Sequence, residues 1–374
     1  MATTRPPFRA DHVGSLLRPR HLLEARQQVK RGELSAERFR AIEDEAVREV
    51  IKLQEDIGLL GVTDGEIRRG SWHMDYIYQI GGIEEQDAPL NIQFQNESGD
   101  VDVVLHAMKV VDKLSLPSTI FERDFRFVQE HLTKGVAKLT IPSPSMVHYR
   151  GGRKAVDETV YPDLEEFYAD LSTVYAQEIA NLDRLGCTYL QLDDTSLAYL
   201  NDPAQRSLIA SQGGDADRQH EIYIRIINEA VKNKPAGMTM TTHLCRGNFR
   251  SSWAASGSYD YVADALFNEL DVDGYFLEFD DDRSGGFEPL RLLPKGDKRV
   301  VLGLVTSKRG ALENKDEIKR RIEAAAKFAP MEQLCLSAQC GFSSTYEGND
   351  ITEDQQKAKL EMIVEIAQDM WGEL

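Results

Sequence analysis

The alternation of short apolar runs with amphipathic helical stretches constrains the fold of this chain more than any other feature. Eight such runs occur along the 374 residues, and most of them are separated by apolar residues at helical spacing. The runs cover residues 10–15, 61–66, 136–141, 189–193, 238–243, 274–278, 299–305 and 334–337. Eight buried strands that alternate with helices are typical of a (β/α)8 barrel. We therefore predict an α/β fold, a (β/α)8 TIM barrel in which residues 1–374 form a single domain.

The stretches between the runs predict the helices and one insertion. Helical patterns cover residues 20–31, 36–58, 119–133, 163–185, 215–233, 257–268, 314–328 and 352–371, with a shorter helix near 287–292. The stretch near 76–116 lacks this pattern, and its runs 92–95 and 101–105 alternate polar with apolar residues. We predict an inserted β-rich excursion there.

The bulk composition excludes several classes of function. A hydrophobic content of 41% with 28% charged residues is ordinary for a globular protein, and a net charge of −18 repels polyanions such as nucleic acids and anionic membrane surfaces. No apolar run approaches the roughly 20 residues of a membrane span, and residues 1–7 lack the apolar core of a secretory signal. We expect a cytoplasmic protein. Four cysteines are too few for a disulfide scaffold in a chain of this length.

Polar and reactive residues gather at the ends of the predicted strands, where the carboxyl-terminal rim of a barrel carries its active site. His243 and Cys245 are two residues apart, so their side chains lean to one side of an extended segment. Glu278 and Cys340 each follow another apolar run. Nitrogen, sulfur, sulfur and oxygen form a donor set suited to Zn2+, and the long sequence separations favour a catalytic site over a zinc finger.

The two thiolates indicate which chemistry such a metal would support. A sulfur-rich ligand set makes zinc a weaker Lewis acid, which suits binding a substrate thiol as thiolate better than activating water. The site therefore favours S-alkylation over hydrolysis. Cys187 and Cys335 lie inside apolar runs, so we interpret them as buried core thiols.

Other rim residues admit two interpretations. Glu66 and Asp193, or Asp194 in its place, either cap the following helices or bind a substrate ammonium group, while Asp64 is expected to hold loop structure. Basic residues of the rim loops are either solvated or receive a carboxylate-rich ligand, and Arg18 and Arg246 are our candidates for cofactor binding. The basic set is Arg18, Arg20, Arg68, Arg69, Arg150, Arg153, Lys154, Arg246 and Lys308. An aromatic set could stack on a flat ring or pack the excursion: Trp72, His73, Tyr76, His148 and Tyr149.

Five short stretches resemble the catalytic C-terminal barrel of cobalamin-independent methionine synthase, most closely its shorter single-barrel relatives. They are residues 11–15, 63–66, 191–194, 243–245 and 339–341. The resemblance implies zinc-dependent methyl transfer to homocysteine from a folate-like donor such as 5-methyltetrahydrofolate (poly)glutamate. It also implies zinc ligands at His243, Cys245, Glu278 and Cys340, homocysteine amine binding by Glu66 and Asp193, and Ser15 near the homocysteine carboxylate. The sequence leaves the oligomeric state open, with a homodimer among the alternatives.

The chain departs from that family where the methyl donor binds. Where the family has a tryptophan that packs on the pterin ring, this chain has His148 nearby, and where it has a proton-donating histidine after strand seven, residues 305–309 offer Lys308. We predict that His148 or Lys308 acts as the acid. An epoxyalkane–coenzyme M transferase-like alkylation, a non-catalytic zinc- and thiol-binding barrel and a zinc hydrolase stay open as alternatives. The carboxylates Glu66 and Asp193 favour an amino-acid thiol over coenzyme M.

Overall fold

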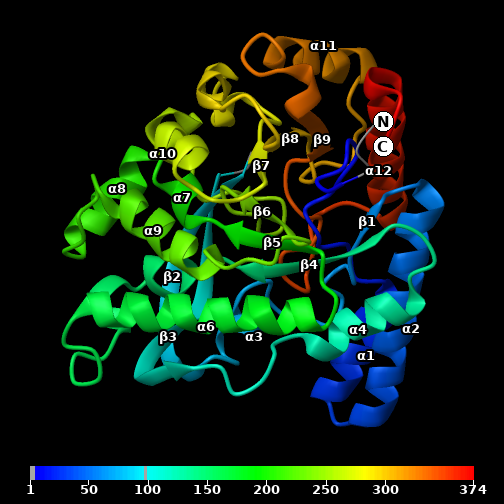
Figure 1. Ribbon diagram of the computed structural model, residues 1–374. Helices are drawn as coiled ribbons and strands as arrows, with labels where there is room; N and C mark the ends of the chain where they lie inside the picture. Colours follow the sequence, from blue (N-terminus) through cyan, green and yellow to red (C-terminus); the bar gives the residue numbers. More distant parts are fainter. Residues whose placement is uncertain (1–4, 97–98) are drawn as a thin grey trace.

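A curled parallel sheet forms the centre of the computed structural model, which describes residues 5–96 and 99–374 (Figure 1). Its seven strands neighbour one another in the order β1-β4-β5-β6-β7-β8-β9, and every pair is parallel. Their bounds are β1 Gly61–Val62, β4 Val136–Pro142, β5 Tyr189–Asp194, β6 Thr239–Leu244, β7 Gly274–Glu278, β8 Arg299–Val305 and β9 Leu334–Ala338. The predicted α/β barrel fold is confirmed. Residues 1–4, part of the stretch used to judge the secretory signal, lie outside the described residues.

The first two predicted strands are shorter than expected. Residues 10–15 form no regular strand and pair through a single parallel bridge between Ala10 and Leu336. The second predicted strand ends at Val62, because the backbone turns at Gly65 and Glu66, whose φ angles are 64° and 56°. The early segment still closes the gap between β9 and β1, since the amide of Leu16 donates to the carbonyl of Gly65 at 3.0 Å.

A buried ion pair holds this early segment inside the barrel. The Lys138 ammonium on β4 lies 3.1 Å from Asp11, and both side chains are fully buried. The hydroxyl of Tyr189 on β5 donates to the other oxygen of Asp11 at 2.7 Å. Asp11 also accepts the backbone amides of Phe8 and His12, so its carboxylate joins the early segment to β4 and β5.

Helices surround the sheet, as Figure 1 shows for α6, α9, α10, α11 and α12. Their bounds are α1 Arg20–Lys30, α2 Ala36–Ile57, α3 Met74–Ile77, α4 Glu122–His131, α5 Met146–Tyr149, α6 Leu164–Arg184, α7 Ser196–Tyr199, α8 Pro203–Ser211, α9 Gln219–Val231, α10 Ala263–Asn268, α11 Lys315–Ala325 and α12 Glu353–Trp371. Local capping explains several limits: Thr352 and Gln355 form a capping box at α12, and Gly58 ends α2 in the left-handed region. None of the helices among the described residues is long and apolar enough to cross a membrane.

Two of the predicted helices are wholly or partly 3-10 helix. The helix expected over 257–268 begins with a 3-10 turn, Tyr259–Tyr261, and only Ala263–Asn268 is α-helical. The short helix near 287–292 is a 3-10 helix, Glu288–Leu292, which begins with a proline in its first turn. The short helices α3, α5, α7 and α8 were not predicted, because four to nine residues are too few to establish a periodic pattern.

The inserted excursion is a long antiparallel hairpin formed by β2, Gly81–Asn96, and β3, Gly99–Ser115. This confirms the β-rich insertion predicted near 76–116, of which residues 97–98 lie outside the described part of the chain. The backbone of Gln95 pairs with that of Trp253, which lies in the loop after β6. The hairpin therefore reaches the same rim as the predicted ligands.

Glu178 on α6 predicts a measurable pH dependence of stability. Its side chain is fully buried, one carboxyl oxygen accepts the Ile120 amide at 2.8 Å, and burial raises its pKa from 4.5 to about 8. The folded protein thus keeps a proton that the unfolded chain releases, so the free energy of unfolding should fall as pH rises from 4.5 to about 8.

Glu178→Gln should remove this fall and make the variant about 2–4 kcal/mol more stable than the wild type at the upper end of the range. Urea unfolding at about pH 5 and about pH 8 measures the free energy of unfolding of both proteins. Glu130→Gln, the same change at an exposed residue, is the control. Equal slopes with pH in the wild type and Glu178→Gln would contradict the assignment.

Candidate functional site

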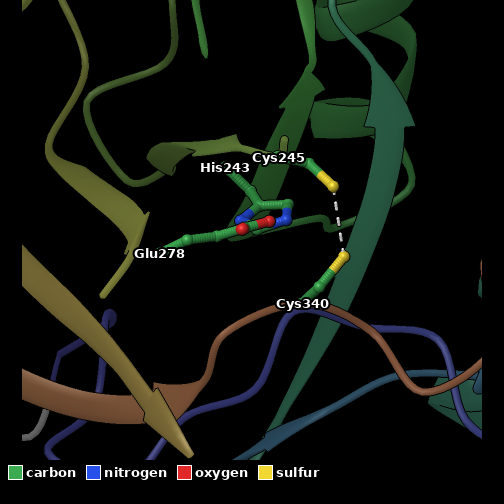
Figure 2. A group of neighbouring side chains, drawn as sticks. All are labelled: His243, Cys245, Glu278 and Cys340. Atoms are coloured by element: carbon green, nitrogen blue, oxygen red, sulfur yellow. Dashed lines mark hydrogen bonds between the residues drawn. The ribbon is translucent and has the colours of Figure 1, made fainter. Parts of the chain in front are cut away.

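Four side chains from three strand ends meet at the carboxyl-terminal rim of the barrel. His243 lies near the end of β6 with Cys245 just after it, Glu278 ends β7, and Cys340 follows β9 by two residues. One potential ligand atom of each lies within 4.8 Å of the others, and all four side chains are buried. In Figure 2 the imidazole and the carboxylate lie side by side, and the two sulfurs point toward each other. The structure brings together all four predicted ligands.

The chemistry of these atoms fits a metal ion. The two sulfur atoms are 3.2 Å apart, beyond the roughly 2.05 Å of a disulfide, and both cysteines are free. The hydrogen bond between them lowers the pKa of the Cys340 thiol and raises that of Cys245. Within the described residues, neither ring nitrogen of His243 has a hydrogen-bond partner, nor does one oxygen of Glu278. Buried polar atoms are rarely left unpaired, so this donor set fits a soft divalent ion such as zinc.

Residues behind the cluster orient it. The backbone amide of Arg246 donates to Glu278 Oε1 at 3.0 Å, and that of Gly247 donates to the sulfur of Cys245 at 3.3 Å. The Arg246 guanidinium is fully buried, lies 4.0 Å from the centroid of the Tyr259 ring and donates to the Glu278 carbonyl. Arg246, predicted to bind a cofactor, therefore supports the candidate ligand Glu278 from behind and does not line the cavity.

A cavity of about 520 Å3 opens beside this cluster. Its walls include three of the four candidate ligands and all three residues predicted to bind the thiol substrate. These lining residues are His243, Cys245, Cys340, Ser15, Glu66 and Asp193.

Two buried carboxylates line the cavity near the candidate ligands. Strand register places Asp193 directly beside His243. Burial raises the pKa of Asp193 to about 7; the nearby His243 lowers this pKa, and the nearby Glu66 raises it further. Burial also raises the pKa of Glu66. Glu66 Oε1 accepts from Thr140 at 2.8 Å, whereas Oε2 has no partner among the described residues. Two buried acids with unused acceptor capacity form a site that an ammonium group would complete.

Two neighbouring acids have structural roles. Asp194 accepts from the Leu197 amide in the first turn of α7 at 2.8 Å, whereas Asp193 lines the cavity. Asp64 accepts the amide of Glu66 at 2.8 Å, which confirms its predicted role in the loop. This bond supports the left-handed backbone of Glu66, a conformation that costs a non-glycine residue about 1 kcal/mol or more.

Ser15 lies against the loop of Cys340. The Ser343 amide donates to its hydroxyl at 3.4 Å, and a Cβ at Gly341 would lie 2.0 Å from that hydroxyl oxygen. Only glycine at position 341 therefore leaves room for Ser15 beside Cys340.

The predicted basic cluster does not form at the cavity. Arg18 is buried and donates to four backbone carbonyls, those of Leu16, Glu66, Arg69 and Ser343. It is a structural tie between loops, and it does not line the cavity. Arg68 pairs with Asp44 and Asp124, and Arg153 donates to the Tyr161 carbonyl. Of the predicted basic set, only Arg150 lines the cavity. Arg250, which was not in that set, lines it as well.

The two predicted acids have separate surroundings. His148 lines a different cavity of about 260 Å3, where the Tyr223 hydroxyl lies 3.1 Å from Nδ1, and burial lowers its pKa to about 4. Lys308 is buried, its ammonium has no partner within the described residues, and its charge lowers the pKa of both Cys245 and Cys340. The structure thus places Lys308, and not His148, near the sulfur cluster.

The predicted aromatic set divides between three places. Trp72 and His73 line the main cavity, with ring centroids 4.4 Å apart. Tyr76 is fully buried in the core, while His148 and Tyr149 line the smaller cavity. Five aromatic residues of the cavity lining were missed: Tyr78, Phe94 of the hairpin, Tyr199, Phe249 of the loop after β6, and Tyr346. The alternation of 92–95 indicates that one face of the hairpin is buried, but not what covers it.

Comparison with known proteins agrees with this arrangement. The family model for the cobalamin-independent synthase catalytic domain matches residues 8–369. The uncharacterized protein YxjH of Bacillus subtilis is 46% identical over 98% of this chain and 96% of its own length, and a methionine synthase of Pyrococcus abyssi is 25% identical over 88% and 84%. A crystal structure from Listeria monocytogenes, assigned as a vitamin-B12 independent methionine synthase, has a TM-score of 0.78 and 38% identity, covering 98% of each chain. The chain belongs to the cobalamin-independent methionine synthase family and corresponds to its single-barrel, catalytic-domain members.

Proposed function

We propose that this protein is a zinc-dependent methyltransferase that methylates the thiol of homocysteine to give methionine. One observation carries the proposal: three members of a buried N, S, S, O cluster and a pair of buried carboxylates line one cavity. The first suits a thiol and the second suits an ammonium group, and homocysteine carries both. Membership in the methionine synthase family supports the same reaction.

His243, Cys245, Glu278 and Cys340 would hold the zinc ion. When bound, zinc would keep the substrate thiol deprotonated at neutral pH and leave its sulfur nucleophilic. The amides of Arg246 and Gly247 orient Glu278 and Cys245 through the hydrogen bonds described above. The ammonium of Lys308 offsets negative charge at the two sulfurs.

The chain's own residues orient the amino-acid part of the substrate. Glu66 and Asp193 would bind its ammonium group, and Thr140 keeps one Glu66 oxygen occupied so that the other faces the ligand. Ser15 would lie near the substrate carboxylate.

The decisive measurement follows an isotope-labelled methyl group into methionine. The donors to compare are 5-methyltetrahydrofolate with one and with several glutamates, S-methylmethionine, methylated amines and methylcobalamin, each with homocysteine as acceptor. We expect transfer from at least one donor that is lost on metal removal by a chelator and restored by zinc. A metal-replete protein that transfers from none of them would contradict the proposal.

A second measurement separates homocysteine from coenzyme M, the thiol of the epoxyalkane transferase alternative. Zinc-edge X-ray absorption should gain one sulfur in the metal shell with homocysteine and no change with coenzyme M, whose sulfonate carries no ammonium for Glu66 and Asp193. The reverse result would favour the epoxide reaction.

A further inference from the structure

The buried guanidinium of Arg69 lies beside Glu66 but does not line the cavity. Its Nη1 atom is 3.6 Å from Oε1 of Glu66, and both side chains are only 3% exposed. Within the described residues, Nη1 makes no hydrogen bond. The neighbouring Arg68 pairs instead with Asp44 and Asp124. Of these two adjacent arginines, Arg69 is thus the one whose charge faces a residue proposed to bind substrate.

Thr140 on β4 holds the two side chains in a fixed relation. Its carbonyl accepts from Nη2 of Arg69 at 2.8 Å, and its hydroxyl donates to Oε1 of Glu66 at 2.8 Å. The backbone adds a further tie, since the amide of Arg69 donates to the carbonyl of Glu66 at 3.0 Å. Oε1 therefore faces Thr140 and Arg69, whereas Oε2, which has no hydrogen-bond partner among the described residues, is free to accept from a ligand.

An aromatic ring covers the guanidinium. The central carbon of the Arg69 guanidinium lies 4.2 Å from the centroid of the Phe121 ring. Phe121 precedes α4 with a φ angle of 58°, a left-handed conformation that a non-glycine residue adopts only at a cost. The ring attracts the cation and takes the place of water that would otherwise screen its charge. The charge of Arg69 therefore acts on Glu66 more strongly than it would at the protein surface.

The charges around Glu66 leave one negative charge in excess. Arg69, Arg18 and Asp64 are the charged groups that act most strongly on its carboxylate, and its own charge acts in turn on Asp193. Three carboxylates thus face two guanidinium groups, and a single ammonium group would balance them. Without Arg69 the excess would double in a buried site, where carboxylates that repel one another take up a proton instead. A protonated acid attracts an ammonium group less strongly.

We propose that Arg69 is a positioning residue of the thiol-substrate site, which keeps Glu66 ionised with one oxygen free and thereby sets the preference for a thiol that carries an ammonium group. The inference rests on the proposed function and deepens it, because it assigns part of the amino-group specificity to a residue outside the cavity. Arg69 acts through Glu66, so its effect requires the charge of both residues.

The test compares two thiols in a binding measurement. Equilibrium dialysis of the zinc-loaded protein is performed with labelled homocysteine and with labelled 4-mercaptobutyrate, the same thiol acid without the amino group. Arg69→Met, which removes the charge, should lower the preference for homocysteine about tenfold or more. Arg69→Gln, a second neutral variant that keeps a donor for Thr140, should show the same loss, and Arg69→Lys should retain most of the preference. In a Glu66→Gln background, Arg69→Met should have little further effect, because the charge that it supports is absent.

The matched control is Arg68→Met, the same change at an adjacent buried arginine that also lies against an aromatic ring, that of Phe127. Its preference should equal that of the wild type, even if urea unfolding shows a lower stability. An unchanged preference in the folded neutral variants, or an equal loss in Arg69→Lys, would overturn the role of Arg69. A wild type that methylates homocysteine without preferring it to 4-mercaptobutyrate would overturn this inference alone. A wild type that binds neither thiol would overturn the proposed function with it.

Discussion

Replacing Cys340 with serine should remove both zinc and methyl transfer. Cys340 is the ligand candidate whose thiol pKa the neighbouring thiol lowers, so it is the sulfur best suited to bind the metal as thiolate. A serine hydroxyl stays protonated and binds zinc poorly. Zinc affinity should fall by more than the roughly 10–100-fold that is typical when only an outer partner of a ligand is lost. Competition against a chromogenic chelator measures the affinity, and labelled methyl transfer measures the activity.

The control for this variant is Cys187→Ser, the same change at a buried thiol outside the cluster. It should keep the zinc affinity of the wild type, even if its stability falls. Circular dichroism and urea unfolding of both variants show whether the barrel is intact. A folded Cys340→Ser protein with stoichiometric zinc and full turnover would remove the basis of the metal site.

A large effect is also expected when the carboxylates proposed to bind the homocysteine amino group are replaced. Glu66→Gln and Asp193→Asn should each raise the KM for homocysteine about 10–100-fold, because each removes a charge-assisted hydrogen bond to the ammonium. Neither residue belongs to the metal cluster, so zinc content should stay at the wild-type level. Retained zinc with a raised KM would distinguish this role from general damage to the site.

A substrate analogue makes this prediction sharper. 4-Mercaptobutyrate keeps the thiol and carboxylate of homocysteine but has no amino group. The wild type should bind it far more weakly than homocysteine, and each carboxylate variant should reduce that preference. If the variants discriminate between the two thiols as strongly as the wild type, Glu66 and Asp193 do not bind the ammonium group.

Sequence reasoning was most successful where short-range pattern and strand topology suffice. The strands from β4 to β9 follow from apolar runs, and each candidate ligand lies at or within two residues of a strand end. The reasoning was less successful at residues 10–15 and 61–66, where an Asp–Gly–Glu turn and buried hydrogen bonds replace regular pairing. It also left open which of two adjacent acids lines the cavity, because Asp193 and Asp194 differ only in the direction of their side chains.

The basic residues and His148 show the limit of such reasoning. Arg18 and Arg246 occur in rim loops as predicted, yet their donors are used by backbone carbonyls, a tyrosine hydroxyl and the end of β7. A guanidinium has the same sequence signature whether it faces a ligand or ties two loops together. His148 likewise follows β4, but the short helix α5 turns it toward Tyr168 and Tyr223.

The sequence by itself determined the barrel and the identity of the candidate metal ligands, because strand and helix patterns are local and parallel strands must present their carboxyl ends on one rim. Only the tertiary structure decided that Cys245 and Cys340, 95 residues apart, touch at 3.2 Å, and that the hairpin delivers Phe94 to the same cavity. These contacts join segments distant in the chain. Their geometry depends on strand register, on left-handed turns and on which polar atoms already have hydrogen-bond partners in other loops. A local sequence pattern predicts none of these.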